Sequence, residues 1–402
     1  MKKTIRDLSL KGKTVLVRVD FNVPLKEGVV KDDNRIREAV PTIKYLVDNG
    51  AKVVLCSHLG KVDHKDSEKC AADKKKNDMK YIVPTLEKLL DRNVKYVDEV
   101  YGDKVDSTLL SLKEGEIMLL QNTRYEKGES KNDPELASKM AKNIDVFVMD
   151  AFGSAHRAHV STYGVPELLN NNGKETAIGF LMEKEIEALT KCVEADEHPY
   201  VAVLGGAKVS DKIKVIEGLL NKADKIVIGG AMAYTFLKAK GVEVGKSLVE
   251  DEQLEFAKKC LKQGKNKIIL PIDHIVSYDL ESDESIPSIN ENIPDMFLGF
   301  DIGPKTREYF DKELANAKIV FWNGPMGVFE NPLYAEGTKR VCEIIAKLDD
   351  AFSVIGGGDS ASAAKQLGYK DKFSHVSTGG GASLEMIEND GSLPGIDIIQ
   401  DK

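Results

Sequence analysis

Basic side chains follow several short apolar segments in the first half of the chain. His58 comes directly after one segment, and Arg124 and Arg157 follow two others. Arginine presents a planar fork of donors that matches carboxylate and phosphate groups. If the segments are parallel strands, their carboxyl ends share the sheet edge where ligands bind. Each residue alone would more simply be a salt-bridge partner, but together they predict a pocket for a small, multiply anionic molecule. The residues expected to converge there are Arg35, His58, Lys61, Arg124 and Arg157.

Four glycine clusters follow apolar segments in the second half, at 205–206, 229–230, 356–358 and 379–381. After such a turn, backbone N–H groups approach an anion closely, and the N-terminus of the next helix adds a favourable partial charge. One cluster could be a simple turn. Four clusters at one sheet edge predict a nucleotide or phosphate site.

Four side chains near these clusters each have a chemical and a plain interpretation. Asp359 is placed to hold Mg²⁺ beside phosphates, or it caps a helix, and the two roles can coexist. Glu330 either accepts bonds from ribose hydroxyls or is an ordinary loop acid. Lys208 and Lys212 are four residues apart at an expected helix start, so they either flank a phosphate chain or lie on the solvated surface.

Motifs of several other enzyme classes are missing. The glycines of 241–245 have three residues between them where a P-loop needs four, and no strand-linked GxGxxG with a following acid supports a dehydrogenase. His156 and His159 lack a third metal ligand with suitable spacing. No GxSxG elbow supports a hydrolase.

The elements that would position these residues are apolar runs alternating with amphipathic helices. This alternation is typical of parallel strands covered on both faces. We therefore expect an α/β fold of two doubly wound parallel-sheet (Rossmann-like) domains, 1–175 and 176–384, joined by a hinge helix at 182–195. The tail, about 385–402, is expected against the first domain, and the charged segment 61–80 is predicted to be an exposed insertion loop rather than a binding arm. The expected strands are 14–19, 52–56, 116–120, 145–149, 200–204, 225–228, 267–270, 318–322 and 351–355.

Composition excludes other classes. The 402 residues are 42% hydrophobic and carry 57 basic against 65 acidic side chains, a net charge of −8 that argues against binding nucleic acid or a membrane. No apolar run is long enough for a transmembrane helix, and the start lacks a signal-peptide pattern. Five scattered cysteines fit free thiols in a reducing cytoplasm.

Eight motifs carry a family resemblance: RVDFNVP (18–24), DNRI (33–36), SHLG (57–60), FGSAHRAH (152–159), GGAKVSDK (205–212), FWNGPMGVFE (321–330), GGGDS (356–360) and STGGGAS (377–383). In order and spacing, the chain resembles the phosphoglycerate kinase family over essentially its whole length. The resemblance implies reversible transfer of the ATP γ-phosphoryl group to the carboxylate of 3-phosphoglycerate, giving 1,3-bisphosphoglycerate and ADP, with Mg²⁺. It also suggests a monomer.

The resemblance places 3-phosphoglycerate on the first domain and the nucleotide on the second. The implied triose-binding residues are Asp20, Phe21, Asn22, Arg35, His58, Leu59, Gly60, Lys61, Arg124 and Arg157. The implied nucleotide-binding residues are Lys208, Gly299, Asn323, Glu330, Gly357, Gly358, Asp359 and Ser360, with Asp359 at the metal. Arg35, Lys212 and the backbone at Gly357 and Gly380 would stabilise the moving phosphoryl group.

The implied chemistry agrees with the residues. A carboxylate acceptor is already ionised near neutral pH, so the absence of an evident general base is expected, and hinge closure would bring the ligands together and exclude water. Lys61 and Val62 depart from the arginine and proline usual in the family, which puts triose-phosphate affinity in question. Another acyl-phosphate-forming kinase stays possible. A catalytically silent binding protein would be expected to lack Arg35, Lys212 or Asp359, and all three are present.

Overall fold

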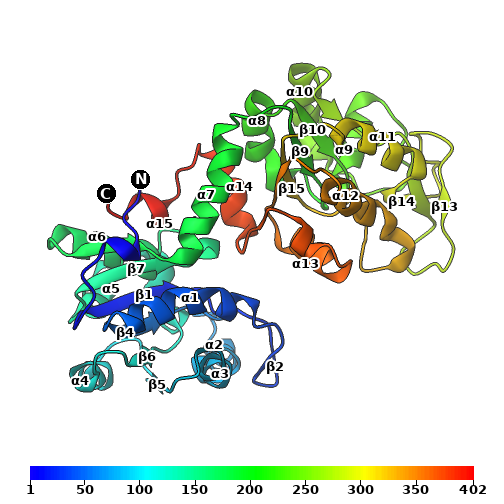
Figure 1. The fold of residues 1–402 in the computed structure, drawn as a ribbon. Helices are drawn as coiled ribbons and strands as arrows, with labels where there is room; N and C mark the ends of the chain where they lie inside the picture. The colour runs from blue at the N-terminus through cyan, green and yellow to red at the C-terminus, as the bar shows by residue number, and fades with distance from the viewer. The chain divides into compact units, whose positions relative to one another are not determined.

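The computed structural model describes residues 1–402 and forms two compact units (Figure 1). Unit 1 comprises Met1–Ile186 and Ser392–Lys402, and unit 2 comprises Glu187–Gly391. Each unit contains one six-stranded sheet in which every strand pair is parallel. The predicted fold class, α/β with two doubly wound parallel sheets, is confirmed.

The sheet of unit 1 is centred on β1 (Thr14–Val19), whose residues are apolar or β-branched apart from Arg18. Arg18 lies level with Cys56 of β4 on one side and Met149 of β7 on the other, so the carboxyl ends of these three strands reach the same edge. The loops that carry the predicted anion-binding residues therefore begin next to one another. The strand order is β5 (Val94–Tyr96), β6 (Ile117–Leu119), β4 (Lys52–Cys56), β1, β7 (Val146–Asp150) and β8 (Glu175–Ile178).

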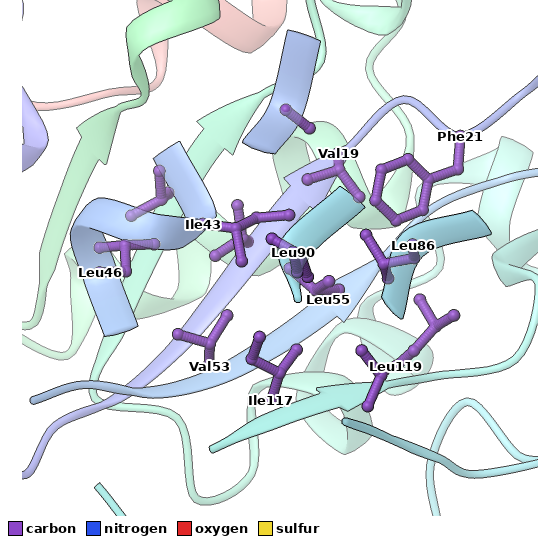
Figure 2. Packing of buried hydrophobic residues seen from close by; sticks show 14 of the residues in the cluster. Val19, Phe21, Ile43, Leu46, Val53, Leu55, Leu86, Leu90, Ile117 and Leu119 are labelled. Carbon is purple, nitrogen blue, oxygen red and sulfur yellow. The ribbon is translucent and has the colours of Figure 1, made fainter. Parts of the chain in front are cut away.

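Figure 2 shows one apolar face of this sheet, which two helices cover. Helix α1 (Asn34–Asp48) contributes Ile43 and Leu46, and α3 (Val83–Leu90) contributes Leu86 and Leu90. Complete burial of such a side chain stabilises the fold by about 1.5–3 kcal/mol. This packing fixes α1, and with it Arg35 in its first turn, against the sheet. The other helices of unit 1 are α2 (Ser67–Lys76), α4 (Asp103–Ser111), α5 (Pro134–Ala141), α6 (Val165–Asn171) and α15 (Pro394–Asp397).

The segment 61–80 is not the loop that the sequence predicted, because it contains α2. The side chain of Asp66 accepts hydrogen bonds from Glu68 N at 2.9 Å and Lys69 N at 3.0 Å, which caps the first turn. No residue of α2 is buried. The apolar periodicity that indicates a helix in a sequence is therefore missing, and the capping residue Asp66 was the sequence signal for this helix.

The sheet of unit 2 is centred on β9 (Tyr200–Leu204) and β15 (Ile319–Asn323). Leu204 lies level with Asn323, so the glycines that follow both strands begin at one edge. The order is β11 (Ile268–Ile269), β10 (Lys225–Ile228), β9, β15, β16 (Phe352–Ile355) and β17 (His375–Val376). The helices are α8 (Ile213–Lys222), α9 (Met232–Lys240), α10 (Leu254–Gly264), α11 (Pro304–Leu314), α12 (Glu336–Ala346), α13 (Gly358–Gln366) and α14 (Gly380–Glu388).

Unit 2 also contains a small antiparallel sheet that the sequence analysis did not predict. It consists of β13 (Ile286–Pro287), β12 (His274–Ser277) and β14 (Leu298–Ile302). Both residues of β13 are exposed, and β14 alternates buried and partly exposed positions only at its start. Short strands of this kind lack the continuous apolar run used to identify the others.

The chain passes from one unit to the other within α7 (Phe180–Glu194), and Ser392–Lys402 returns to unit 1. Two backbone hydrogen bonds join the ends of the chain, from Lys3 N to Gln400 O at 2.8 Å and from Lys402 N to Met1 O at 3.0 Å. No helix in the structure combines the length and the apolar character that crossing a membrane requires.

Candidate active site

The loop after β1 carries an ion pair at the sheet edge of unit 1. Arg35 Nη1 donates to Asp20 Oδ2 at 2.7 Å, and the Asp20 side chain is only 5% exposed. The other carboxylate oxygen accepts from Asn22 N at 3.1 Å. Asn22 Oδ1 in turn accepts from Gly60 N at 2.8 Å, in the loop after β4. Asp20 therefore orients Arg35, and Asn22 ties two loops together.

His58 is a buried, neutral imidazole. Arg18 Nη2 lies 3.0 Å from His58 Nδ1, and a guanidinium can only donate, so Nδ1 accepts and Nε2 carries the proton. Burial lowers the pKa of His58 well below 6.5, and the nearby charges of Arg18 and Arg124 lower it further, with smaller contributions from Arg35 and Arg157. The ring therefore stays uncharged at neutral pH.

Arg18 has a structural role that sequence reasoning did not assign. Its side chain is buried, and Nε donates to Ser161 Oγ at 2.8 Å. Ser161 donates through both its hydroxyl and its backbone N–H to the buried carboxylate of Glu129. A buried charge needs partners of this kind. Glu129 and Ser161 were missed because a glutamate in a charged loop and an isolated serine give no distinctive sequence signal.

A cavity of about 300 Å³ lies beside these loops, and it is lined by Lys61, Arg124 and Arg157 together with His64, Glu129 and His159. Arg124 is half-buried, and burial is the main reason that its pKa is lowered, followed by the charges of Arg157 and Arg18. Burial likewise lowers the pKa of His159 to about 4, so this ring is uncharged. The cavity therefore gathers three cationic side chains, the buried carboxylate of Glu129 and the half-buried carboxylate of Glu126.

Three of the predicted triose residues do not present side-chain donors. Phe21 and Leu59 are buried, and their backbone N–H groups donate to Ser57 Oγ at 2.8 Å and Asn122 Oδ1 at 3.1 Å. Gly60 has φ +60°, and a Cβ there would lie 2.3 Å from Asn77 Oδ1. These residues shape the loops on which the charged residues stand.

The glycine loops of unit 2 are bound directly to one another. Gly205 N donates to Asn323 O at 2.9 Å, Gly324 N donates to Ser360 Oγ at 2.6 Å, and the Asn323 amide donates to the carbonyl of Gly356. A Cβ on Gly380 would lie 3.0 Å from Gly357 Cα. The loops after β9, β15 and β16 and the N-terminus of α14 thus form one tightly packed group.

Lys212 lies beside these loops and is half-buried. Its Nζ is 3.7 Å from where a Cβ on Gly206 would stand. Burial lowers the pKa of Lys212, and the negative charges of Asp211 and Asp359 oppose that shift. An ammonium group with little water around it gains more from a phosphate partner than a surface lysine does.

The remaining predicted nucleotide residues differ in exposure. Lys208, Glu330, Gly358 and Asp359 are exposed. Gly299 lies on β14, its N–H donates to Ser247 Oγ at 2.9 Å, and a Cβ there would lie 2.1 Å from the Tyr234 hydroxyl oxygen. Gly299 therefore allows Tyr234 to pack against β14.

A metal ion at this site would need ligands from outside the protein. The chain contains no group of three or more histidine, cysteine, aspartate or glutamate side chains that could hold a metal. Mg²⁺ is commonly bound by one or two carboxylates together with substrate phosphates. The exposed carboxylate of Asp359, in the first turn of α13, fits that pattern.

Known proteins match the whole of this arrangement. A family model described as Phosphoglycerate kinase matches residues 5–390. A protein named Phosphoglycerate kinase from Fusobacterium nucleatum subsp. nucleatum is 51% identical, and one from Enterococcus faecalis is 52% identical, each alignment covering 100% of both chains. The solved structure of phosphoglycerate kinase from Coxiella burnetii has a TM-score of 0.86 at 37% identity and covers 99% of this chain and 98% of that one.

The fold and these relatives define an enzyme of the phosphotransferase class, as the sequence analysis predicted. Within that class, the chain belongs to the phosphoglycerate kinase family, whose members carry out glycolytic, ATP-dependent phosphoryl transfer.

Proposed function

We propose that unit 1 binds 3-phosphoglycerate and unit 2 binds ATP or ADP with Mg²⁺, and that the γ-phosphoryl group passes reversibly between ATP and the triose carboxylate. The observation that carries the proposal is the cavity of unit 1, because Lys61, Arg124 and Arg157 line it. Their guanidinium and ammonium groups are the kind of donors that bind phosphate and carboxylate groups.

On the triose side, the residues divide into two groups. Arg124, Arg157 and Lys61 supply positive charge, while His58 contributes a neutral ring whose proton is on Nε2. Asp20, Asn22 and Arg35 form the connected group at the end of β1. We assign the first group to holding the substrate and Arg35 to stabilising the transferred group, with Asp20 fixing its direction.

On the nucleotide side, the glycine loops allow close approach of phosphates. Gly357, Gly358 and Ser360 would present backbone and hydroxyl groups at the N-terminus of α13, where the helix dipole favours an anion. Lys208, Gly299, Asn323 and Glu330 would surround the rest of the nucleotide. Asp359 would hold the Mg²⁺, which when bound neutralises charge on the phosphate oxygens.

Catalysis on this proposal consists of positioning and charge neutralisation. The acceptor carboxylate has an ordinary pKa far below neutral pH, so no base has to remove a proton. Arg35, Lys212 and the backbone N–H groups of Gly357 and Gly380 would stabilise charge on the phosphoryl oxygens as it develops. In-line transfer also requires the two bound ligands to meet, with water excluded.

We further propose that the enzyme works as a cytoplasmic monomer. All five cysteines are free thiols, which fits a reducing compartment.

A coupled assay tests the proposed function. The purified protein is given 3-phosphoglycerate and Mg-ATP, and the product is removed by glyceraldehyde-3-phosphate dehydrogenase while NADH loss is followed. We expect turnover that falls by at least about a hundredfold in Lys212→Ala, because a donor to the charged transition state is removed. ATP binding, measured calorimetrically, should persist in the variant. No turnover in the wild type despite ATP binding would refute the triose assignment and direct the search to other carboxylate acceptors.

A further inference from the structure

His64 lines the anion cavity, although it lies outside every motif described above. It stands between β4 and α2, in the segment that the sequence predicted to be a loop. The residue is half-buried, whereas its neighbour Lys65 is exposed. Its side chain is therefore partly shielded from solvent.

The ring of His64 is bound to the backbone of Arg124. His64 Nε2 lies 2.9 Å from the Arg124 carbonyl oxygen. A carbonyl can only accept, so Nε2 carries a proton and donates it. The other ring nitrogen, Nδ1, faces Cys70 Sγ of α2 at 3.8 Å. His64 thus connects Arg124 on one side with α2 on the other.

Arg124 is held at two further points. Its backbone N–H donates to Asn122 Oδ1 at 3.0 Å, and its Nη1 donates to Gly60 O at 2.5 Å. The next residue is also fixed, because the Tyr125 hydroxyl donates to the carbonyl of Lys74 in α2. Of these contacts, only the one from His64 holds the Arg124 carbonyl, so it limits rotation of the peptide plane that follows Arg124.

We propose that His64 is a positioning residue of the 3-phosphoglycerate site. By holding the Arg124 carbonyl, it fixes the main chain from which the Arg124 guanidinium enters the cavity, and it couples that guanidinium to the docking of α2. The proposal rests on the assignment of Arg124 to 3-phosphoglycerate made above. It gives α2, which buries no residue of its own, a function in substrate binding.

Substitutions at position 64 separate the hydrogen bond from the volume of the ring. His64→Leu keeps an apolar side chain of similar size and removes the donor. His64→Gln places an amide N–H close to the position of Nε2 and keeps a donor. Lys69→Ala, on the exposed surface of α2, is the matched control.

The readouts are the KM for each substrate, kcat, and direct binding of 3-phosphoglycerate by calorimetry without nucleotide. In His64→Leu we expect the KM and Kd for 3-phosphoglycerate to rise about fivefold, the effect of losing one hydrogen bond, with the KM for ATP unchanged. His64→Gln should recover most of the affinity, and Lys69→Ala should match the wild type. An unchanged Kd in His64→Leu refutes the proposal, as does a loss that His64→Gln fails to recover.

Arg124→Ala distinguishes failure of this proposal from failure of the site assignment. If the assignment is right, Arg124→Ala raises the Kd for 3-phosphoglycerate by more than His64→Leu does. If Arg124→Ala leaves the Kd unchanged, the assignment itself is wrong and the role of His64 falls with it. If only the Arg124 variant loses affinity, the assignment stands and the proposal for His64 is refuted.

Discussion

Replacing Gly380 with alanine tests whether the packing of the glycine loops controls the rate of phosphoryl transfer. Gly380 is the first residue of α14, where alanine is compatible with the helix. The new Cβ would lie 3.0 Å from Gly357 Cα, 3.2 Å from Gly358 N and 3.3 Å from Gly356 O. All three neighbours are backbone atoms, so the loop after β16 has to move by a few tenths of an ångström.

The expected magnitude follows from that displacement. A misplacement of 1 Å can lower an enzymatic rate by about a hundredfold, so a few tenths should lower kcat about three- to tenfold. Overpacking should lower the free energy of unfolding by about 1–3 kcal/mol. The coupled assay at saturating substrates measures kcat, and thermal unfolding measures stability.

Gly218→Ala is the matched control for this prediction. Gly218 lies inside α8 of the same unit, and a Cβ there meets only Glu388 Cα and Ile387 O, each at 3.8 Å. The substitution should raise the free energy of unfolding by about 1 kcal/mol through helix propensity and leave kcat unchanged. If Gly380→Ala and Gly218→Ala have the same kcat as the wild type, the argument from loop packing to rate is wrong.

Three other predictions concern unit 1. Because the pKa of His58 is lowered in the folded protein, its contribution to stability is complete above pH 6.5 and is lost as the pH falls from there through the folded pKa. His58→Asn keeps an acceptor for Arg18 and should make the unfolding temperature depend less on pH in this range. An unchanged pH dependence in the variant would contradict this assignment to His58. Asp20→Asn weakens the ion pair with Arg35 and should lower the free energy of unfolding by about 1–3 kcal/mol in denaturant titrations. A loss below about 0.3 kcal/mol would show that the ion pair contributes little to stability. Lys61→Arg introduces the planar fork of the arginine usual in the family and should lower the Kd for 3-phosphoglycerate about two- to threefold in calorimetry. A higher Kd would show that the shape of the cavity favours lysine at this position.

The parallel sheets could be predicted because their strands are continuous apolar runs. The strands 14–19, 52–56, 200–204 and 225–228 were predicted with the bounds that the structure has. Helix boundaries are less predictable where the first turn is 3-10, as at Met79–Ile82, which continues directly into α3. Periodicity alone does not distinguish these two kinds of turn.

Residues of the proposed site could be predicted only where chemistry and position coincide. Charged residues in the loops after strands, such as Arg124 after β6, could be proposed because the carboxyl ends of the strands share one sheet edge. His64 could not, because the role proposed for it depends on a helix without a buried face and on a backbone carbonyl of a distant loop. The same holds for Glu129, whose partner Ser161 lies 32 residues away.

The return of Ser392–Lys402 to unit 1 has a consequence for biosynthesis. Because synthesis proceeds from the N-terminus, every residue of unit 2 is made before the segment that completes unit 1. The nascent Met1–Ile186 therefore lacks the contacts of Gly395 N with Ala155 O at 2.8 Å and of Asn170 Nδ2 with Ile398 O at 2.7 Å until late in translation. All of unit 2 is therefore synthesised before unit 1 can form these contacts.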